Sequence, residues 1–415
     1  MHVVVLGAGI LGVSSAWYLR QEGHEVTVVE RQPGAALETS FANGSQLSVG
    51  HVEPWASLET LPQLWKWGFS ERAPVLFRPR ADLAQWQWGA QFFLECWPAR
   101  NRHNLRELLN LGLYSRAAQQ ALRAETGIEF QAIDRGILNL YATPAEWARG
   151  SRAAAEITRL GYPRHRITRE EALRIEPALG NMRAPWVGAT YTPGDGSGDA
   201  HQWTQVLAEK CRALGVVFHF NQSVLGLAEE AGRITGVRLA GRETLLGADA
   251  VVAALGSYTP LLLRPHGIRI PVYPVKGYSA TVPLLRPETA PQVSITDDAW
   301  KMVFSRLGDT LRIAGTAEFT GYDTRLNEAR CNALIERARL LFPEAADYGQ
   351  PTFWAGLRPA TPSNRPLIGR TRIPNLFLNT GHGTLGWTTG CGSGKALAAI
   401  VSGRRPEVDF SFSGL

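Results

Sequence analysis

The chain has 415 residues, about two to three times the length of one typical domain, which is enough to bury a large core without disulfides or a structural metal. Its residues are 45% apolar and 19% charged, a globular composition that excludes a disordered or collagen-like chain. The net charge of +6 is mild for this length and no run of lysine or arginine occurs, so we expect no nucleic-acid partner. The four cysteines lie far apart, which disfavours a zinc or iron–sulfur site, and we expect no metal.

No apolar run reaches the length that a membrane span needs. The apolar residues 3–6 are followed at once by glycines and have no basic stretch before them, so they predict a strand and not a signal peptide. We therefore expect a cytoplasmic protein, and peripheral attachment to a membrane stays open.

The first thirty residues predict a strand over 2–6, a helix over 12–21 and a second strand over 25–30. This order implies an α/β fold, with a parallel sheet that carries helices on its faces. Further helices are predicted over residues 105–125, 151–160, 169–175, 201–214, 326–341 and 393–401, and further strands over 216–220 and 248–257. Because distant segments must share one sheet, we expect the nucleotide domain to be discontinuous.

Residues 54–98 contain six of the thirteen tryptophans, together with phenylalanines and interspersed basic residues. Two interpretations stay open. The segment is either a helical cap packed on a substrate domain, or a surface that contacts lipid headgroups, where tryptophan and basic side chains favour the interface.

Residues 7–12 read Gly-Ala-Gly-Ile-Leu-Gly, a G-x-G-x-x-G motif between the first predicted strand and helix. Gly7 permits the tight turn, Gly9 lets the backbone approach a pyrophosphate, and Gly12 lets helix and strand pack closely. The helix N-terminus stabilises the pyrophosphate charge, and Glu30 accepts hydrogen bonds from ribose hydroxyls. The motif predicts a dinucleotide site formed by Gly7, Ala8, Gly9, Ile10, Leu11, Gly12 and Glu30.

Two later segments favour FAD over a nicotinamide cofactor, because they add further contacts for a longer ligand. A predicted strand reaches Gly256, which lets the backbone run close to a cofactor. Residues 375–388 predict a strand that enters a glycine loop shortly before a helix, where N–H groups stabilise the negative end of a reduced flavin. The loop residues expected to bind the cofactor are Gly381, His382, Gly383, Thr384, Leu385 and Gly386.

The motif at residues 7–12, the loop at 381–388 and the segment Gly-Leu-Arg-Pro at 356–359 resemble the FAD-dependent D-amino acid oxidase superfamily. Within it, residues 38–44, 53–56, 274–279 and 379–388 closely resemble the small subunits of bacterial D-amino acid dehydrogenases, and the resemblance runs nearly end to end. That family often has glycine where Ser45 stands in this chain.

The resemblance implies a two-domain fold of the D-amino acid oxidase type, with a Rossmann-like FAD-binding domain and an α+β substrate domain. The implied FAD-binding domain covers residues 1–53, 185–270 and 345–415, and the implied substrate or cap domain covers 54–184 and 271–344. Further implied cofactor contacts come from Arg31, Ser40, Asn43 and Gly44.

The implied activity is oxidation of D-amino acids to 2-oxo acids and ammonium. Hydride passes to flavin, and electrons pass on to a quinone or other acceptor from a peripheral inner-membrane protein. One alternative is a secondary-amine oxidase or dehydrogenase of the same superfamily, acting on sarcosine, glycine or D-hydroxyproline. Another is a non-catalytic flavin-binding subunit, which an intact Arg358 argues against. No cysteine lies in residues 356–369, so we expect non-covalent FAD.

Arg358 is expected to bind the substrate carboxylate, because a guanidinium forms two parallel hydrogen bonds with it. The resemblance implies that Lys276 lies close to the flavin ring, where a cation would tune its redox potential. Tyr273 and Tyr278 flank that lysine and are candidates to hydrogen-bond the substrate, although strand tyrosines are as often part of a core. His51 either lines the site or is a satisfied structural histidine.

Overall fold

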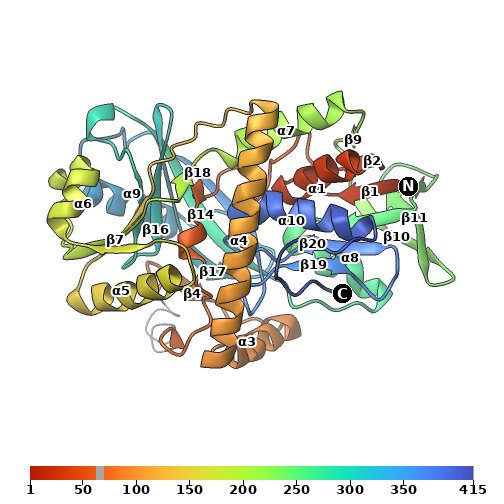
Figure 1. Ribbon diagram of the computed structural model, residues 1–415, viewed down its shortest axis with the longest axis horizontal. Helices are drawn as coiled ribbons and strands as arrows, with labels where there is room; N and C mark the ends of the chain where they lie inside the picture. Colours follow the sequence, from red (N-terminus) through yellow and green to blue (C-terminus); the bar gives the residue numbers. More distant parts are fainter. Residues whose placement is uncertain (62–69, 415) are drawn as a thin grey trace.

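The computed structural model describes residues 1–61 and 70–414, which form two main sheets with helices around them (Figure 1). The smaller sheet has six strands in the order β19-β20-β13-β1-β2-β9, parallel except for β19 at one edge. They are β1 (His2–Leu6), β2 (Glu25–Val29), β9 (Val217–His219), β13 (Ala250–Ala253), β19 (Leu367–Arg370) and β20 (Leu376–Thr380). This confirms the predicted α/β fold, in which distant parts of the chain share one parallel sheet.

The larger sheet runs in the order β18-β14-β17-β16-β15-β5-β7-β6, and β4 pairs with β17. Its strands are β4 (Val75–Phe77), β5 (Ile137–Tyr141), β6 (His165–Ile167), β7 (Gly188–Thr192), β14 (Tyr273–Pro283), β15 (Ser294–Asp297), β16 (Met302–Leu307), β17 (Thr310–Phe319) and β18 (Thr352–Ala360). Strands β7 and β18 belong to this sheet, whereas the predicted boundaries at 185 and 345 group them with the FAD-binding segments. The grouping of strands into sheets does not by itself define domain boundaries, so the predicted division into domains stays a prediction.

Three smaller groups of strands and turns complete the sheets. A three-stranded antiparallel sheet comprises β10 (Val224–Glu230), β11 (Arg233–Leu239) and β12 (Leu246–Gly247). β3 (Gln46–Leu47) pairs with β8 (Gly196–Ser197), and the single turn η1 (Val49–His51) follows β3. The short helix α8 (Thr259–Leu263) follows β13.

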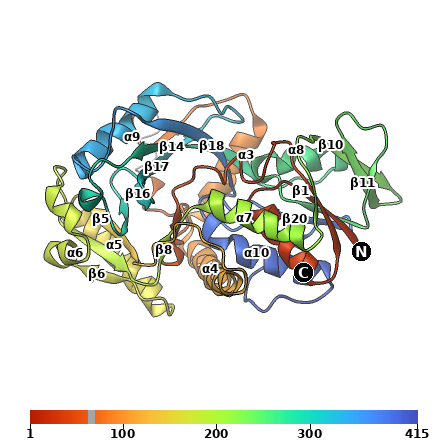
Figure 2. The ribbon, with the colours of Figure 1, turned by 90° about the horizontal axis from the view of Figure 1, so that it is seen from above.

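The long helix α4 (Pro98–Thr126) crosses the middle of the molecule, with the smaller sheet on one side and the larger sheet on the other (Figures 1 and 2). It begins seven residues before the predicted start at 105, because Pro98 is well suited to a first helical turn. Helix α5 (Pro144–Arg159) also starts early, at a capping box of Thr143 and Glu146, so the predicted start at 151 is wrong. Helices α1 (Ile10–Gln21), α6 (Arg169–Ile175), α7 (Ala200–Ala213) and α9 (Glu328–Leu341) lie within two residues of their predictions.

Helix α10 (Gly386–Val401) starts seven residues before the predicted position 393, and its glycines explain the error. A Cβ on Gly390 would lie 2.9 Å from Ile10 Cγ1, and one on Gly394 would lie 2.7 Å from the Ser14 carbonyl carbon, both on α1. A Cβ on Gly392 would lie 2.6 Å from Ser115 Cα on α4. The glycines therefore allow three helices to pack closely rather than ending α10.

The tryptophan-rich segment 54–98 contains one long described helix, α3 (Leu83–Glu95), beside the foot of α4 (Figure 1). Trp88 and Phe92 pack against Tyr273 and Phe319 of the larger sheet, as expected for a helical cap, and the lipid-contact interpretation of this segment stays a prediction. Trp65, Trp67 and Phe69, which the sequence analysis counts in this segment, lie outside the described residues.

Candidate active site

A cavity of about 2290 Å³ reaches from the smaller sheet to the larger sheet. Its walls include the turn before α1, the segment around residues 36–61, the facing strands β14, β17 and β18, and the loop before α10. Pockets for a single small ligand usually hold about 300–1,000 Å³. This cavity therefore has room for a dinucleotide together with a substrate.

The turn between β1 and α1 has the geometry that the motif predicts. Gly7 adopts φ +100°, which a side chain would disfavour, and a Cβ on Gly12 would lie 1.8 Å from the Gly7 carbonyl oxygen. A Cβ on Gly9 would meet only Ser40 Oγ, at 3.3 Å, so Gly9 leaves open space beside the first turn of α1. Ser40 Oγ accepts a hydrogen bond from the Ile10 N–H at 3.1 Å.

Glu30 lies at the end of β2 and lines the cavity, where its carboxylate faces the same turn. One oxygen accepts from the Ala8 N–H at 2.8 Å and the other from the Gln32 N–H at 2.9 Å. Burial raises the pKa of Glu30, and the two backbone donors oppose this shift. The neighbouring Arg31 guanidinium lies 4.1 Å from the centre of the Tyr258 ring and pairs with Glu38 at 2.5 Å.

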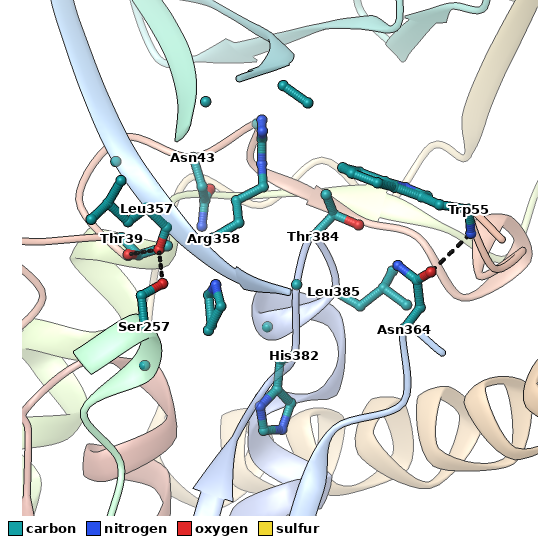
Figure 3. Close-up of a pocket in the computed structure, with 18 of the residues that line it drawn as sticks. Thr39, Asn43, Trp55, Ser257, Leu357, Arg358, Asn364, His382, Thr384 and Leu385 are labelled. Atoms are coloured by element: carbon teal, nitrogen blue, oxygen red, sulfur yellow. Dashed lines mark hydrogen bonds between the residues drawn. The ribbon is translucent and has the colours of Figure 1, made fainter. Parts of the chain in front are cut away.

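The loop before α10 forms a second wall of the cavity (Figure 3). Gly381 and Gly383 adopt φ +81° and +54°, and Leu385, the N-cap of α10, makes no side-chain cap hydrogen bond. The helix N-terminus at Gly386 therefore presents backbone donors to the cavity without a side-chain cap. His382 Nε2 bonds Ser393 Oγ at 2.9 Å, and the buried Nδ1 has no hydrogen-bond partner among the residues that the structure describes. Burial lowers the His382 pKa to about 3, so the ring is neutral.

Arg358 on β18 reaches into the cavity across β14. Its guanidinium lies where a Cβ on Gly277 would be, 2.3 Å from the guanidinium carbon, and it donates to the Thr316 carbonyl at 2.7 Å. It meets no carboxylate among residues 1–61 and 70–414. Burial, and then the charge of Arg330, lower the Arg358 pKa to about 10. A buried cation without an anion is a suitable site for a ligand carboxylate.

Two side chains fix the backbone beside Arg358. Thr39 Oγ1 and Ser257 Oγ both donate to the Leu357 carbonyl, at 3.0 and 3.1 Å (Figure 3). Thr39 belongs to the segment after β2 and Ser257 follows β13. The strand that carries the cation is therefore tied directly to the nucleotide-binding part.

Lys276, Tyr273 and Tyr278 lie differently from Arg358. Among the residues that the structure describes, Lys276 and Tyr273 are not part of the cavity wall. The Lys276 ammonium lies 3.5 Å from the Glu318 carboxylate. Tyr273 donates to Asp82 at 3.2 Å. Tyr278 lines the cavity, but its hydroxyl donates to Glu318 at 2.5 Å, and burial, followed by this bond, raises its pKa. These contacts do not favour a substrate contact for Lys276 or Tyr273.

The cavity nonetheless brings together most of the predicted site residues. Those that line it are Gly7, Gly9, Ile10, Leu11, Glu30, Arg31, Ser40, Asn43, Gly44, Gly256, Tyr278, Arg358, His382, Gly383, Thr384, Leu385 and Gly386. Ala8, Gly12 and Gly381 lie behind this wall, where they shape its backbone.

Sequence reasoning named His51 as a residue that could line the site, but missed the polar cluster on the far wall of the cavity to which it belongs, formed by His51, Glu53, Arg164, Asp298 and Lys301. These residues come from three separate segments, residues 51–53, Arg164 and residues 298–301, and no local spacing relates the three. The one sequence signal for Glu53 was that it lies in the segment 53–56, which carries the family resemblance. The resemblance gave that segment no role.

The cavity has backbone N–H groups on two walls, the Glu30 carboxylate at the end of the first, and a buried guanidinium, an arrangement that suits a flavin dinucleotide. The family model for FAD dependent oxidoreductases matches residues 2–400, so the chain belongs to that family and its cofactor is FAD. The open space at Gly9, the uncapped start of α10 and the size of the cavity fit that group.

Curated relatives are similar to this chain along its whole length. It is 53% identical over 415 residues to the D-amino acid dehydrogenase of Dechloromonas aromatica (strain RCB), covering 99% of each chain. It is 49% identical to the D-amino acid dehydrogenase of Paramagnetospirillum magneticum (strain ATCC 700264 / AMB-1), covering 100% of this chain and 98% of that one. The crystal structure of glycine oxidase from Geobacillus kaustophilus has the same fold, with a TM-score of 0.76 at 22% identity over 98% of this chain and 96% of that one.

Proposed function

We propose that this protein oxidises D-amino acids to 2-oxo acids and ammonium, as the names of its relatives indicate for them. The observation that carries the proposal is Arg358, a buried guanidinium that faces the cavity and has no carboxylate partner among the described residues. Bound FAD supplies the acceptor for the hydride that leaves the α-carbon. Arg358 holds the substrate carboxylate through two N–H groups and so fixes which face of the α-carbon meets the flavin.

The other residues act by holding the cofactor and the strand. Glu30 would accept hydrogen bonds from the ribose hydroxyls, and the backbone around Gly9 would hold the pyrophosphate. The start of α10 at Gly386 offers N–H groups to the negative end of the flavin. Lys276 and Tyr278 act on the site through Glu318, by fixing strand β14 below Arg358. Water hydrolyses the imino acid product to the 2-oxo acid without a further group.

We propose that FAD is bound non-covalently. Cys211, Cys331 and Cys391 are buried outside the cavity wall. Cys96 lines the cavity beside α3, far along the chain from the nucleotide motif, and burial raises its pKa, which keeps the thiol protonated and unreactive.

Anaerobic bleaching of the bound flavin tests the reaction. D-Alanine and other D-amino acids should bleach the flavin at least about tenfold faster than their L-enantiomers, since a fixed carboxylate presents only one face. The measurement is the absorbance of the yellow holoenzyme after mixing with D-, L- and N-alkyl amino acids. Faster bleaching by sarcosine or D-hydroxyproline would instead make the protein a secondary-amine enzyme. No bleaching by any of them would indicate a non-catalytic subunit.

We further propose that the protein works at the cytoplasmic face of the inner membrane and passes electrons to a quinone. No helix among the described residues is long and apolar enough to cross a membrane. Helix α3 and the start of α4 instead expose Leu83, Trp86, Phe93, Leu94 and Trp97 at helical spacing. Arg100, Arg102 and Arg106 are exposed on the following turns. Trp86 and Phe93 also line the cavity, so this apolar face adjoins the route to the flavin.

Binding to vesicles tests this face. Phe93→Glu should weaken binding to anionic phospholipid vesicles roughly 10- to 100-fold, because burying a phenylalanine side chain contributes about 1.5–3 kcal/mol. Leu285→Glu, which changes an equally exposed apolar residue elsewhere, is the control and should bind as the wild type does. Co-sedimentation at two salt concentrations measures both. The membrane proposal would be wrong if the wild-type protein did not bind the vesicles, or if both variants lost binding affinity equally.

A further inference from the structure

The polar cluster on the far wall centres on His51, at the end of the single turn η1. The Val49 and Gly50 N–H groups donate to Asp195 at 2.9 and 3.1 Å, which fixes this turn. A Cβ on Gly50 would lie 2.4 Å from Thr192, so the backbone has no room to move. The position of the His51 ring therefore depends on the fold and not on a flexible loop.

The His51 ring has one nitrogen toward a carboxylate and the other toward the cavity. Nδ1 is buried and lies 3.3 Å from Glu53 Oε2, without the alignment of a hydrogen bond. Nε2 has no hydrogen-bond partner among the described residues, and the exposed third of the side chain faces the cavity. A carboxylate beside Nδ1 favours the proton on that nitrogen, which leaves Nε2 as an acceptor.

Glu53 is held as an anion by Arg164. Burial opposes ionisation of Glu53, but the guanidinium pairs with its other oxygen and the pKa of Glu53 is lowered. Arg164 is itself buried and also donates to the Gly50 carbonyl at 3.0 Å and to Tyr141 at 3.2 Å. This anion remains beside His51 throughout the neutral pH range, ready to stabilise an imidazolium.

The remaining charged groups around His51 are Asp298, with Lys301 at 2.6 Å from it and Arg149 at 3.6 Å. Burial lowers the His51 pKa below its usual value near 6.5, and the Glu53 charge opposes this shift without cancelling it. His51 is therefore neutral, and able to accept a proton, at physiological pH.

The two polar parts of the cavity border neighbouring strands. Arg358 approaches the Gly315 carbonyl of β17 at 3.5 Å, and Gly315 pairs across the sheet with Met302 of β16, next to Lys301. Neighbouring strands lie about 4.8 Å apart. Arg358 and the His51 cluster thus line the same cavity from neighbouring strands.

We propose that His51 accepts the proton of the substrate ammonium group before hydride leaves the α-carbon, with Glu53 as the positioning residue. An N–H bond of the ammonium breaks, an Nε2–H bond forms, and the nitrogen lone pair released can then form the C=N bond of the imino acid. Desolvation beside the Arg358 cation lowers the ammonium pKa, and Glu53 offsets part of the effect of burial on the His51 pKa, so the transfer is less unfavourable than it would be without these two charges. This inference rests on the proposed oxidation of amino acids.

The test measures the rate at which saturating D-alanine bleaches the flavin anaerobically, from about pH 5.5 to about pH 10. In the wild type the rate should fall only at a pH lower than the usual histidine value of about 6.5, where His51 becomes protonated. In His51→Gln the rate near pH 7 should be roughly 100-fold lower, the usual range for a lost proton acceptor being about 10²–10⁴. It should then rise about tenfold per pH unit, because only substrate that is already neutral reacts, and should approach the wild type at high pH.

Two further variants separate proton transfer from structure. Glu53→Gln removes the anion that raises the His51 pKa, so its acid limb should move to lower pH, which a merely structural role would not produce. His165→Gln, an exposed histidine next to Arg164, is the matched control and should keep the wild-type profile. His51→Asn replaces His51→Gln if the latter does not bind FAD.

The outcomes distinguish this inference from the function on which it rests. If the wild type is not bleached by any D-amino acid, the proposed function fails. If it is bleached, but the His51 variant has the wild-type rate or is slowed equally at every pH, only the role of His51 is overturned.

Discussion

Arg358→Met is expected to slow flavin bleaching by D-alanine by roughly 30- to 5,000-fold while FAD content stays at the wild-type level. Removing one partner of a buried, hydrogen-bonded charge pair costs about 2–5 kcal/mol, and each 1.36 kcal/mol is tenfold in rate. Arg358 lies beside Gly277 and Thr316 on the substrate side, and the FAD-binding contacts around Gly9 and Glu30 do not involve it. The measurement is the bleaching rate together with the flavin-to-protein absorbance ratio.

The same substitution should not destabilise the protein without substrate. The Arg358 guanidinium is buried against Thr316 with no carboxylate among the described residues, and an uncompensated buried charge is unfavourable. The melting temperature of Arg358→Met in the absence of substrate should therefore equal or exceed that of the wild type. Arg365→Met is a matched control, because Arg365 pairs with Glu107 and should lose stability when it is removed.

Arg358→Lys separates charge from shape. Lysine keeps the cation but lacks the two parallel donors, so we expect a rate about 30- to 1,000-fold below the wild type. An Arg358→Met protein that is bleached at the wild-type rate would show that the carboxylate is bound elsewhere. A variant that instead lost FAD would assign this residue to the cofactor.

The nucleotide half of the fold could be predicted from the sequence because its signals are local. The turn at residues 7–12 lies between a buried strand and a helix, and every glycine in it has a steric reason that spacing alone reveals. The start of α10 could not be predicted in this way. Its glycines read as a loop, whereas their role is to admit Ile10, Ser14 and Ser115, which are more than 270 residues away in sequence.

The catalytic half of the site depends on contacts between distant segments. The place of Arg358 in the cavity was predictable from its motif. The place of Lys276 was not, because it depends on the pairing of β14 with β17 and on the contact with Glu318, which no pattern near residue 276 indicates. The His51 cluster joins η1 to β5, β6 and the β15–β16 turn, so each of its charges reads as an ordinary surface residue in the sequence. Ser45 shows the opposite case. It adopts φ +62°, a conformation that favours glycine, and glycine is the residue that the resemblance implies at this position.

Gly9→Val should weaken FAD binding without unfolding the protein, and this distinguishes the cofactor contact from the fold. The backbone of Gly9 has φ −72°, which valine also adopts, and a Cβ there meets only Ser40 Oγ, at 3.3 Å. The added methyl groups would occupy the space beside the first turn of α1, where the pyrophosphate lies against the backbone. Overpacking costs about 1–3 kcal/mol or more, so affinity should fall by roughly 5- to 150-fold.

Two companion variants make this result specific to the pyrophosphate contact. Gly12→Val should fail to fold, because its Cβ would lie 1.8 Å from the Gly7 carbonyl oxygen within the packed strand–helix turn. Gly247→Val, where nothing lies within 4 Å of the added atom, should keep both fold and cofactor. Circular dichroism measures folding, and acid precipitation measures FAD, since non-covalent flavin leaves its colour in the supernatant. If Gly9→Val held FAD as tightly as Gly247→Val, the pyrophosphate would have to approach another part of the turn, and yellow colour in the pellet would instead show a covalent bond.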